Sequence, residues 1–429
     1  MFRLYGLRLL KRGVTDLRHA PLFPCANWRR ISTSKAGQSI TAATTTLKPH
    51  FFSPNHAQEI LQVSDVMMPA PLLPTTAIEN LPGRDTGTYK VQSIGSVSEL
   101  FKIYSQLSKS RLTFLVVLSS MAGVAMCPLP TTVPILLSTA LGTALCSAAA
   151  NTFNQLSEVP LDAQMARTRT RPLVRGAISV NHAAGFGIVT GLAGPAILAA
   201  VNPTAAFLGA ANIVLYSGVY TTLKRVHVSN TWVGAVVGGI PPLIGWTACG
   251  GHLIPSSTFE LFLPSFFLDA STIAPILSID NPLAPLALFG LLYSWQFPHF
   301  NSLAHMVRDA YTQGGYKMLP VTNTRLNTLV SLRHSIALAG ICAILTPLSG
   351  LTTWMFALTS LVPNIYLTSA AWKFWKSGTD KNAKILWNIS LWYLPVVLAL
   401  MMFHKQGMEW LSFLGPKDTE AIEMKQEHT

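Results

Sequence analysis

The chain has 429 residues, of which 50% are hydrophobic and only 11% are charged. Soluble domains carry about 25% charged residues, so this composition excludes an ordinary soluble protein and favours one that folds in a membrane. Lys and Arg outnumber Asp and Glu by 31 to 18, a formal charge of +13 that suits an anionic membrane surface, an anionic substrate or nucleic acid.

The first fifty residues are basic and contain a single acid, Asp16, before they end in a Ser/Thr-rich stretch. This composition predicts a mitochondrial transit peptide over residues 1–50. A disordered basic tail is the plainer alternative. Residues 51–105 are polar and interrupted by prolines, so we expect a mostly irregular segment on the matrix side.

Apolar stretches then follow one another, each close to the length of about 20 residues that a membrane-spanning helix needs. They are residues 112–127, 132–156, 182–201, 204–223, 231–250, 283–304, 331–348, 352–372 and 385–404. We therefore predict an all-α, polytopic membrane domain over residues 106–405 with about nine transmembrane helices. Residues 406–429 form a polar tail.

The basic residues of the connections lie on one side of this topology. The loops after the second, fourth, sixth and eighth stretches carry Lys and Arg, whereas the loops after the first, third, fifth and seventh carry none. Because Lys and Arg mark the inner face of a membrane, the pattern predicts a multi-pass protein of the mitochondrial inner membrane with its N terminus in the matrix. We expect no nucleic-acid partner.

Carboxylates are rare on the predicted matrix face, where only Glu158, Asp162 and Asp309 occur between residues 112 and 372. An acid near the centre of a membrane helix costs roughly 2.5–3.5 kcal/mol, so acids at this edge indicate function. Asn154, Glu158 and Asp162 recur every four residues, which places three oxygen-bearing side chains on one helix face. We expect Pro160 to end or kink this helix before Asp162. Such hard oxygen ligands suit Mg²⁺, whose octahedral shell a substrate phosphate normally completes.

Four arginines follow the acids, namely Arg167, Arg169, Arg171 and Arg175. A guanidinium stays charged and binds phosphate oxygens in pairs. Acids beside arginines therefore predict a site for a metal and a diphosphate together. The plainer alternative is that the arginines only orient the chain and the acids are their salt-bridge partners.

Two further groups of polar residues end on the same predicted face. The group after the fourth stretch contains Tyr220, Lys224, Arg225, His227 and Asn230. The group after the sixth stretch contains His299, His305, Arg308, Asp309 and Tyr311. His299 ends an aromatic-rich helix, where a histidine is either structural or faces a cavity and there holds a tetrapyrrole or moves a proton. For His305 we favour a structural role.

Three sequence blocks, in this order, resemble the UbiA-type membrane prenyltransferases over most of residues 112–404. The first block is Asn154-x-x-x-Glu158-x-x-x-Asp162 with Arg171-Pro-Leu-x-Arg175-Gly176. The second is Tyr220-Thr-x-x-Lys224-Arg225 with Asn230-Thr, Gly234-Ala and Pro241-Pro242, and the third is Trp295-Gln-Phe-Pro298-His299-Phe300. The first block is typical of the whole family, and the other two together resemble its haem-using branch.

The resemblance implies a UbiA-like helical bundle with a membrane-level cavity and transfer of farnesyl from farnesyl diphosphate to protohaem IX. The product would be haem O, on the route to haem A for cytochrome c oxidase. By position, Mg²⁺ would be bound by Asn154, Glu158, Asp162 and Asp309. The diphosphate would be held by Arg167, Arg171, Lys224 and Arg225. Substrate contacts would come from Arg175, Tyr220, His227, Asn230, His299, Arg308, Asp309 and Tyr311. The implied partners are both substrates, the lipid bilayer and other proteins of the haem pathway.

One position departs from the family pattern, which has an acid immediately before the tyrosine of its last block. Here Ala310 precedes Tyr311 and Asp309 lies one position away, which leaves open the residue that completes the second half of the metal site. Two other functions remain open. A quinone-pathway aromatic prenyltransferase would not need His299, and a haem or solute transporter would bind the same charged cargo without reaction.

Overall fold

The structure is a computed structural model that describes residues 96–254 and 281–406. Within these ranges the chain is helical and forms no strand beyond one isolated bridge between Thr352 and Lys405. The predicted transit peptide, residues 1–50, and the tail from residue 407 lie outside the described residues.

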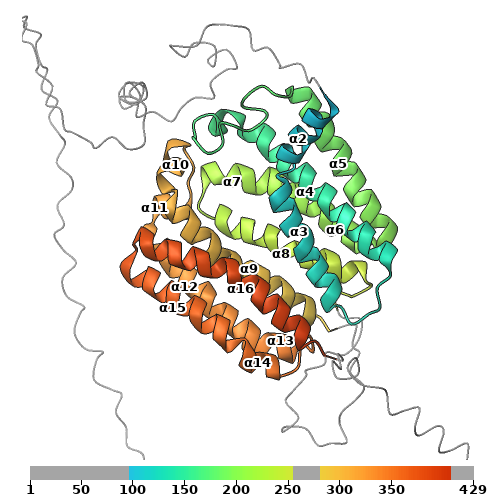
Figure 1. Ribbon diagram of the computed structural model, residues 1–429, viewed down its shortest axis with the longest axis vertical. Coiled ribbons are helices and arrows are strands. Elements are labelled where there is room, and N and C mark those ends of the chain that lie inside the picture. The colour runs from blue at the N-terminus through green and yellow to red at the C-terminus, as the bar shows by residue number, and fades with distance from the viewer. Residues whose placement is uncertain (1–95, 255–280, 407–429) are drawn as a thin grey trace, which may run out of the picture. The chain divides into compact units, whose positions relative to one another are not determined.

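The elements follow one another in the order shown in Figure 1. The first half contains α2 (Val97–Leu107), α3 (Ser110–Met126), α4 (Val133–Asp162), α5 (Val180–Val201), α6 (Pro203–Val214), the π-helical turn η2 (Leu215–Tyr220), α7 (Thr221–Val226) and α8 (Asn230–Ala248). The second half contains α9 (Leu283–Met306), α10 (Arg308–Gln313), α11 (Leu319–Thr322), α12 (Thr324–Gly340), η5 (Ile341–Leu345), α13 (Thr346–Leu348), α14 (Met355–Thr359), α15 (Leu361–Ser377) and α16 (Asp380–Phe403).

Every apolar stretch predicted from the sequence coincides with helix. Among the described residues, five helical segments are long and apolar enough to cross a membrane, namely α4, α5, the run Pro203–Val226, the run Thr324–Leu348 and α16, and the bent pair of α2 and α3 would be a sixth if it forms one span. That α3, α8, α9 and α15 also cross it stays a prediction. At the described end of the segment expected to be mostly irregular, α2 is a helix that meets α3 at an angle of 60°.

Helix α4 differs from the prediction at its C-terminal end. We expected Pro160 to end or kink the helix, but α4 continues through Pro160 to Asp162. Proline lacks the N–H that would donate to the Leu156 carbonyl, and with only two residues left in the helix this is the one backbone hydrogen bond that α4 loses. The expectation that the helix ends before Asp162 was wrong, and Asp162 therefore shares the helix with Asn154 and Glu158.

Small residues bring helix backbones together at two crossings. A Cβ atom added to Gly123 of α3 would lie 2.0 Å from the Pro242 carbonyl oxygen of α8, and one added to Gly245 of α8 would lie 1.9 Å from the Ser120 carbonyl oxygen. On α5, a Cβ at Gly187 would lie 3.1 Å from the Phe153 ring of α4. These glycines therefore serve close helix packing.

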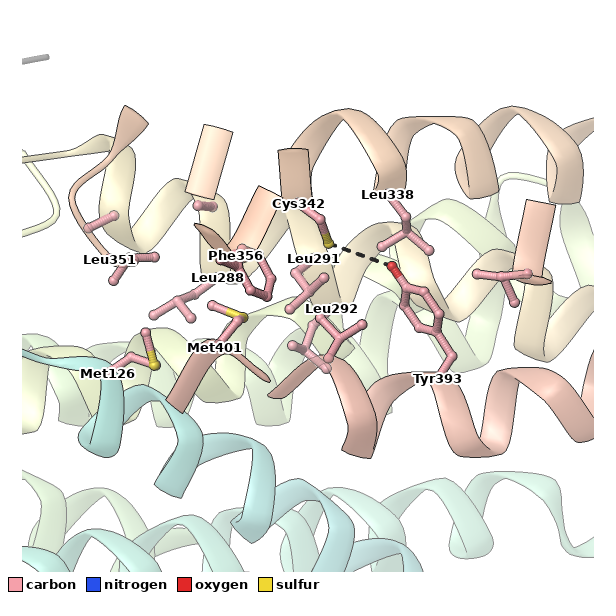
Figure 2. Close-up of a cluster of buried hydrophobic side chains, with 14 of the residues drawn as sticks. Met126, Leu288, Leu291, Leu292, Leu338, Cys342, Leu351, Phe356, Tyr393 and Met401 are labelled. Carbon is pink, nitrogen blue, oxygen red and sulfur yellow. Dashed lines mark hydrogen bonds between the residues drawn. The ribbon is translucent and has the colours of Figure 1, made fainter. Parts of the chain in front are cut away.

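The apolar core of the second half holds α9 against α12 and α16. Leu288, Leu291 and Leu292 of α9 lie in one buried cluster with Tyr393 of α16 (Figure 2). The Tyr393 hydroxyl donates to Asn364 Oδ1 at 2.8 Å, so this polar group is satisfied inside the core. Helix α9 also packs against α8 of the first half. The core thus fixes the helix that carries His299.

Candidate active site

The three oxygen-bearing residues predicted to share a helix face do so. Asn154, Glu158 and Asp162 stand on successive turns of α4, with side chains that are buried in the structure: their residues are only 1%, 4% and 1% exposed. Buried carboxylates require compensation by opposite charge. Their partners therefore define the site.

Two of the predicted cations supply this compensation. Lys224 Nζ of α7 lies 2.6 Å from Glu158 Oε1. Arg171 Nη1 donates to Asp162 Oδ2 and lies 3.7 Å from Glu158 Oε2, so it bridges both acids. The other Asp162 oxygen, Oδ1, is buried with no hydrogen-bond partner among the described residues. A buried carboxylate oxygen without a donor is suited to a cation.

A third cation, Lys109, was missed by the sequence reasoning. Lys109 adopts the left-handed conformation (φ 48°) in the turn between α2 and α3. Its Nζ donates to Asn154 Oδ1 at 2.8 Å and to the Tyr216 hydroxyl at 3.3 Å. Burial, together with the charges of Arg171 and Lys224, lowers the pKa of Lys109 to about 7. Only its place just before the first apolar stretch on the basic face could have indicated it.

The group of residues after α9 reaches the same cluster. Lys224 Nζ lies 6.0 Å from the centre of the Tyr316 ring. Burial and then the charges of Glu158 and Asp162 raise the pKa of Tyr316. The Lys317 N–H donates to the Lys224 carbonyl at 2.8 Å. The loop after α9 therefore contacts the charged cluster through Tyr316 and Lys317.

Asn230 ties this loop to the start of α8. Its Nδ2 donates to the His227 carbonyl at 2.7 Å and to the Lys317 carbonyl at 3.0 Å. Asn230 is fully buried. Its side chain links the two loops that carry His227 and Lys317 and is not open to substrate in the structure. A substrate contact by Asn230 stays a prediction.

Other residues predicted for the site lie apart from the acids. Arg225, His227 and Asp309 are exposed. Arg167 is exposed as well, with its guanidinium 6.0 Å from the centre of the buried Tyr311 ring. Among the described residues, no three His, Cys, Asp or Glu side chains come close enough to hold a metal together. Asp309 therefore does not join Glu158 and Asp162 here.

Two predicted arginines have partners of their own. Arg308 Nη1 lies 2.7 Å from Asp380 Oδ1, and His305 Nε2 lies 3.2 Å from the same oxygen. This group ties the end of α9 to the start of α16, in agreement with a structural His305. Arg175 donates to Gln106 Oε1 at 3.0 Å. Roles for Arg175 and Arg308 in substrate binding stay predictions.

An apolar cavity of about 390 Å³ adjoins the charged cluster, within the 300–1,000 Å³ range common for ligand pockets. Tyr216 and Tyr220 line this cavity and also contact the cations: Lys109 donates to Tyr216, and Lys224 Nζ lies 4.6 Å from the Tyr220 ring centre. Both tyrosines stand on η2, and π-helical turns often occur at functional sites. Gly234 makes room for Tyr220, since an added Cβ would lie 2.9 Å from the ring.

His299 of α9 also lines the cavity, together with Trp295 and Phe300. Its ring stacks on Trp295 with centroids 4.7 Å apart, and its Nδ1 lies 2.9 Å from Ser390 Oγ of α16. His299 thus lines a cavity and also has structural partners, so a role in binding a tetrapyrrole or moving a proton stays a prediction.

The fold and the site together define a class of helical membrane protein in which a cluster of acids and cations borders an apolar cavity. A solved structure of digeranylgeranylglyceryl phosphate synthase shares this fold, with a TM-score of 0.57 at 14% identity over 72% of this chain and 99% of that one. Residues 116–402 match the UbiA prenyltransferase family. The chain belongs to the UbiA prenyltransferase family, which confirms the resemblance of the three sequence blocks.

Curated relatives are similar over most of the membrane domain. The chain is 42% identical to the mitochondrial protohaem IX farnesyltransferase of Yarrowia lipolytica over 333 residues, covering 74% of this chain and 64% of that protein. It is 42% identical to the human protein of the same name over 311 residues, covering 72% and 64%. The chain thus spans slightly less than two thirds of the length of these relatives.

Proposed function

We propose that this protein transfers the farnesyl group of farnesyl diphosphate to a vinyl group of protohaem IX and so forms haem O, the precursor of haem A in cytochrome c oxidase. The observation that carries the proposal is the junction at Tyr216 and Tyr220, where a cluster that suits a diphosphate opens into an apolar cavity that holds His299. The names of the curated relatives support it.

The charged cluster suits the departing diphosphate. The allylic C–O bond must ionise, and negative charge then gathers on the diphosphate oxygens. Arg171, Lys224 and Lys109 lie around the three α4 residues. They can turn from the protein oxygens to the diphosphate when it binds, which leaves Glu158 and Asp162 free for a cation.

The donor set fits Mg²⁺. Asn154, Glu158 and Asp162 present hard oxygen atoms on one helix face, and Asp162 Oδ1 is a buried oxygen that lacks a donor. These three residues would hold the ion, and diphosphate oxygens would complete its shell. When bound, the ion supplies Lewis-acid stabilisation of the leaving group.

The rest of the reaction takes place in the cavity. Tyr216 and Tyr220 stack with ring centroids 5.4 Å apart at its charged end, and aromatic faces stabilise a neighbouring carbocation. The haem vinyl group attacks the allylic cation, and water adds to the resulting cation with loss of a proton to give the hydroxyethylfarnesyl side chain. We place the protein in the mitochondrial inner membrane with its charged cluster on the matrix side.

The test is to incubate the purified full-length protein with protohaem, farnesyl diphosphate and Mg²⁺ and to follow the haem by mass spectrometry. A haem heavier by one farnesyl group and one hydroxyl group supports the proposal. Product with an aromatic acid and none with haem would instead establish the quinone-pathway activity. Haem binding without any product would favour a transporter.

A further inference from the structure

His299 lies in a seam between α9 and α16 that contains a second polar side chain, Ser390. Ser390 is fully buried, and its Oγ lies 2.9 Å from His299 Nδ1. The same Oγ lies 2.6 Å from the Trp387 carbonyl oxygen, one turn earlier on α16. The Ser390 carbonyl in turn accepts from Trp295 Nε1 at 2.8 Å. Ser390 is thus fixed from three directions.

The hydrogen atoms of this seam can be assigned by counting. A carbonyl oxygen only accepts, so the single hydroxyl proton of Ser390 is the one donated to Trp387. Toward His299 the Ser390 oxygen can therefore only accept, and the proton between them belongs to His299 Nδ1. The neutral imidazole then carries its lone pair on Nε2, for which no hydrogen-bond partner exists among the described residues.

The plane of the ring is fixed as well. His299 stacks with Trp295, at 4.7 Å and 17°, and with Trp387, at 6.4 Å and 30°. Since His299 lines the cavity and turns Nδ1 toward Ser390, Nε2 is the nitrogen left for a ligand there. Neutral Nε2 is a common iron ligand, and a hydrogen bond from Nδ1 increases its basicity.

We propose that Ser390 is a positioning residue that holds His299 in the Nδ1–H tautomer, so that Nε2 binds the iron of the porphyrin acceptor in the cavity. This inference rests on the proposed function for the identity of the acceptor. The iron bond would fix one face of the macrocycle and so present a particular vinyl group to the farnesyl cation formed at the tyrosine end of the cavity.

The experiment compares two probes that differ only in the metal, ferric protohaem IX and iron-free protoporphyrin IX, by titration into the purified full-length protein. We expect Ser390→Ala to weaken ferric haem binding by roughly 10-fold or more, the usual effect of losing a hydrogen bond behind a metal-binding histidine. The Soret band of haem bound to Ser390→Ala should shift toward that of haem bound to His299→Ala. Protoporphyrin IX should bind parent and variant equally, because it forms no axial bond.

Two further variants keep the test decisive. Ser390→Thr retains the hydroxyl, so we expect it to retain the haem spectrum of the parent. Ser335→Ala removes another fully buried serine hydroxyl, one that donates to the Ser331 carbonyl at 2.8 Å on α12 and does not contact His299. It should leave both affinities unchanged.

The inference is overturned if Ser390→Ala binds ferric haem with the affinity and spectrum of the parent. It is equally overturned if the variant loses haem and protoporphyrin to the same extent, since that would indicate a packing defect. The proposed function fails separately: a parent with a His299-dependent haem spectrum but no farnesyl transfer keeps the role of Ser390 and loses the reaction. If the parent makes haem O but its haem spectrum does not depend on His299, the proposed function holds and the role of Ser390 is lost.

Discussion

Glu158 of α4 and Lys224 of α7 form a buried ion pair, with Lys224 Nζ 2.6 Å from Glu158 Oε1. Both side chains are less than one tenth exposed, so each neutralises a charge that would otherwise lie unpaired beside the cavity. The pair closes the site between two helices that are distant in sequence. The pair also has two roles that can be tested independently. It stabilises the substrate-free protein, and we expect Lys224 to bind the diphosphate when substrate is present.

We expect Lys224→Met to destabilise the protein and to abolish farnesyl transfer. Loss of one partner from a buried pair costs roughly 3–5 kcal/mol, and we expect the lower end because Arg171 remains 3.7 Å from Glu158 Oε2. Thermal unfolding in detergent measures the change. The double variant Lys224→Met with Glu158→Gln should recover most of the stability but none of the activity. Recovery of activity in the double variant would remove Lys224 from diphosphate binding.

Arg171 bridges Asp162 and Glu158, and its planar fork is what a diphosphate requires. Arg171→Lys keeps the charge but loses the paired geometry. We expect the KM for farnesyl diphosphate to increase by about 10-fold or more, because the substitution removes one charged hydrogen bond to the diphosphate. Arg169→Lys is the matched control, because Arg169 lies in the same loop, is exposed and makes no side-chain contact with the described residues of the site. Equal effects of the two substitutions would contradict the assignment.

Asp162→Asn should leave the protein folded and inserted yet inactive, since the carboxylate charge is needed by the metal. Asparagine preserves the size of this buried side chain but weakens its pairing with Arg171, so we expect a lower melting temperature together with complete loss of activity. Asp309→Asn is the comparison that the sequence could not decide. Asp309 is exposed and does not join the acids in the structure, so we expect substantial residual activity.

If Asp309→Asn is as inactive as Asp162→Asn while both variants remain folded, the second half of the metal site includes Asp309 after all. The loop that carries it would then have to move toward α4 when substrate binds. Isothermal titration with Mg²⁺ and inorganic pyrophosphate distinguishes these cases, because a ligand residue changes metal affinity and a distant one does not.

The periodic parts of the site were predictable, and the parts that depend on tertiary contacts were not. The spacing of Asn154, Glu158 and Asp162 defines a helix face whatever surrounds it. Lys109 enters the site only because a left-handed residue bends the chain between α2 and α3, and nothing in its neighbours specifies that bend. Arg308 shares the predicted face with the acids but pairs with Asp380, 72 positions later, a choice that only the packing of α9 on α16 makes.

The same distinction explains the end of α4. Local preference argued that Pro160 would stop the helix, whereas the structure continues it for two more residues. The continued helix places the Asp162 carboxylate against Arg171, and this charge-assisted hydrogen bond offsets part of the cost of the backbone hydrogen bond that proline cannot make. The fold class and the family could be predicted from the sequence. The ion-pair partner of each charged residue could be identified only in the structure.

Lys109 gives the site a specific pH dependence. Its pKa is lowered to about 7, first by burial and then by Arg171 and Lys224, so above pH 7 the substrate-free protein holds it neutral. A bound diphosphate stabilises the ammonium, and binding above pH 7 must therefore take up a proton. We expect the affinity for farnesyl diphosphate, relative to that of Lys109→Met, to be greatest below pH 7 and to fall by up to about tenfold per pH unit above it. The diphosphate's own titration is common to both proteins and cancels in the ratio.

The stability of the ligand-free protein should change with pH in the opposite direction to the affinity for farnesyl diphosphate. Because the folded pKa lies below the ordinary value of 10.5, the unfolded chain binds a proton that the fold releases between pH 7 and 10.5. The stability of the parent relative to Lys109→Met should therefore rise with pH across that window and stay constant below it. Parallel unfolding curves at every pH, together with a constant affinity ratio, would show that Lys109 does not titrate in the site and that its hydrogen bond to Asn154 is purely structural.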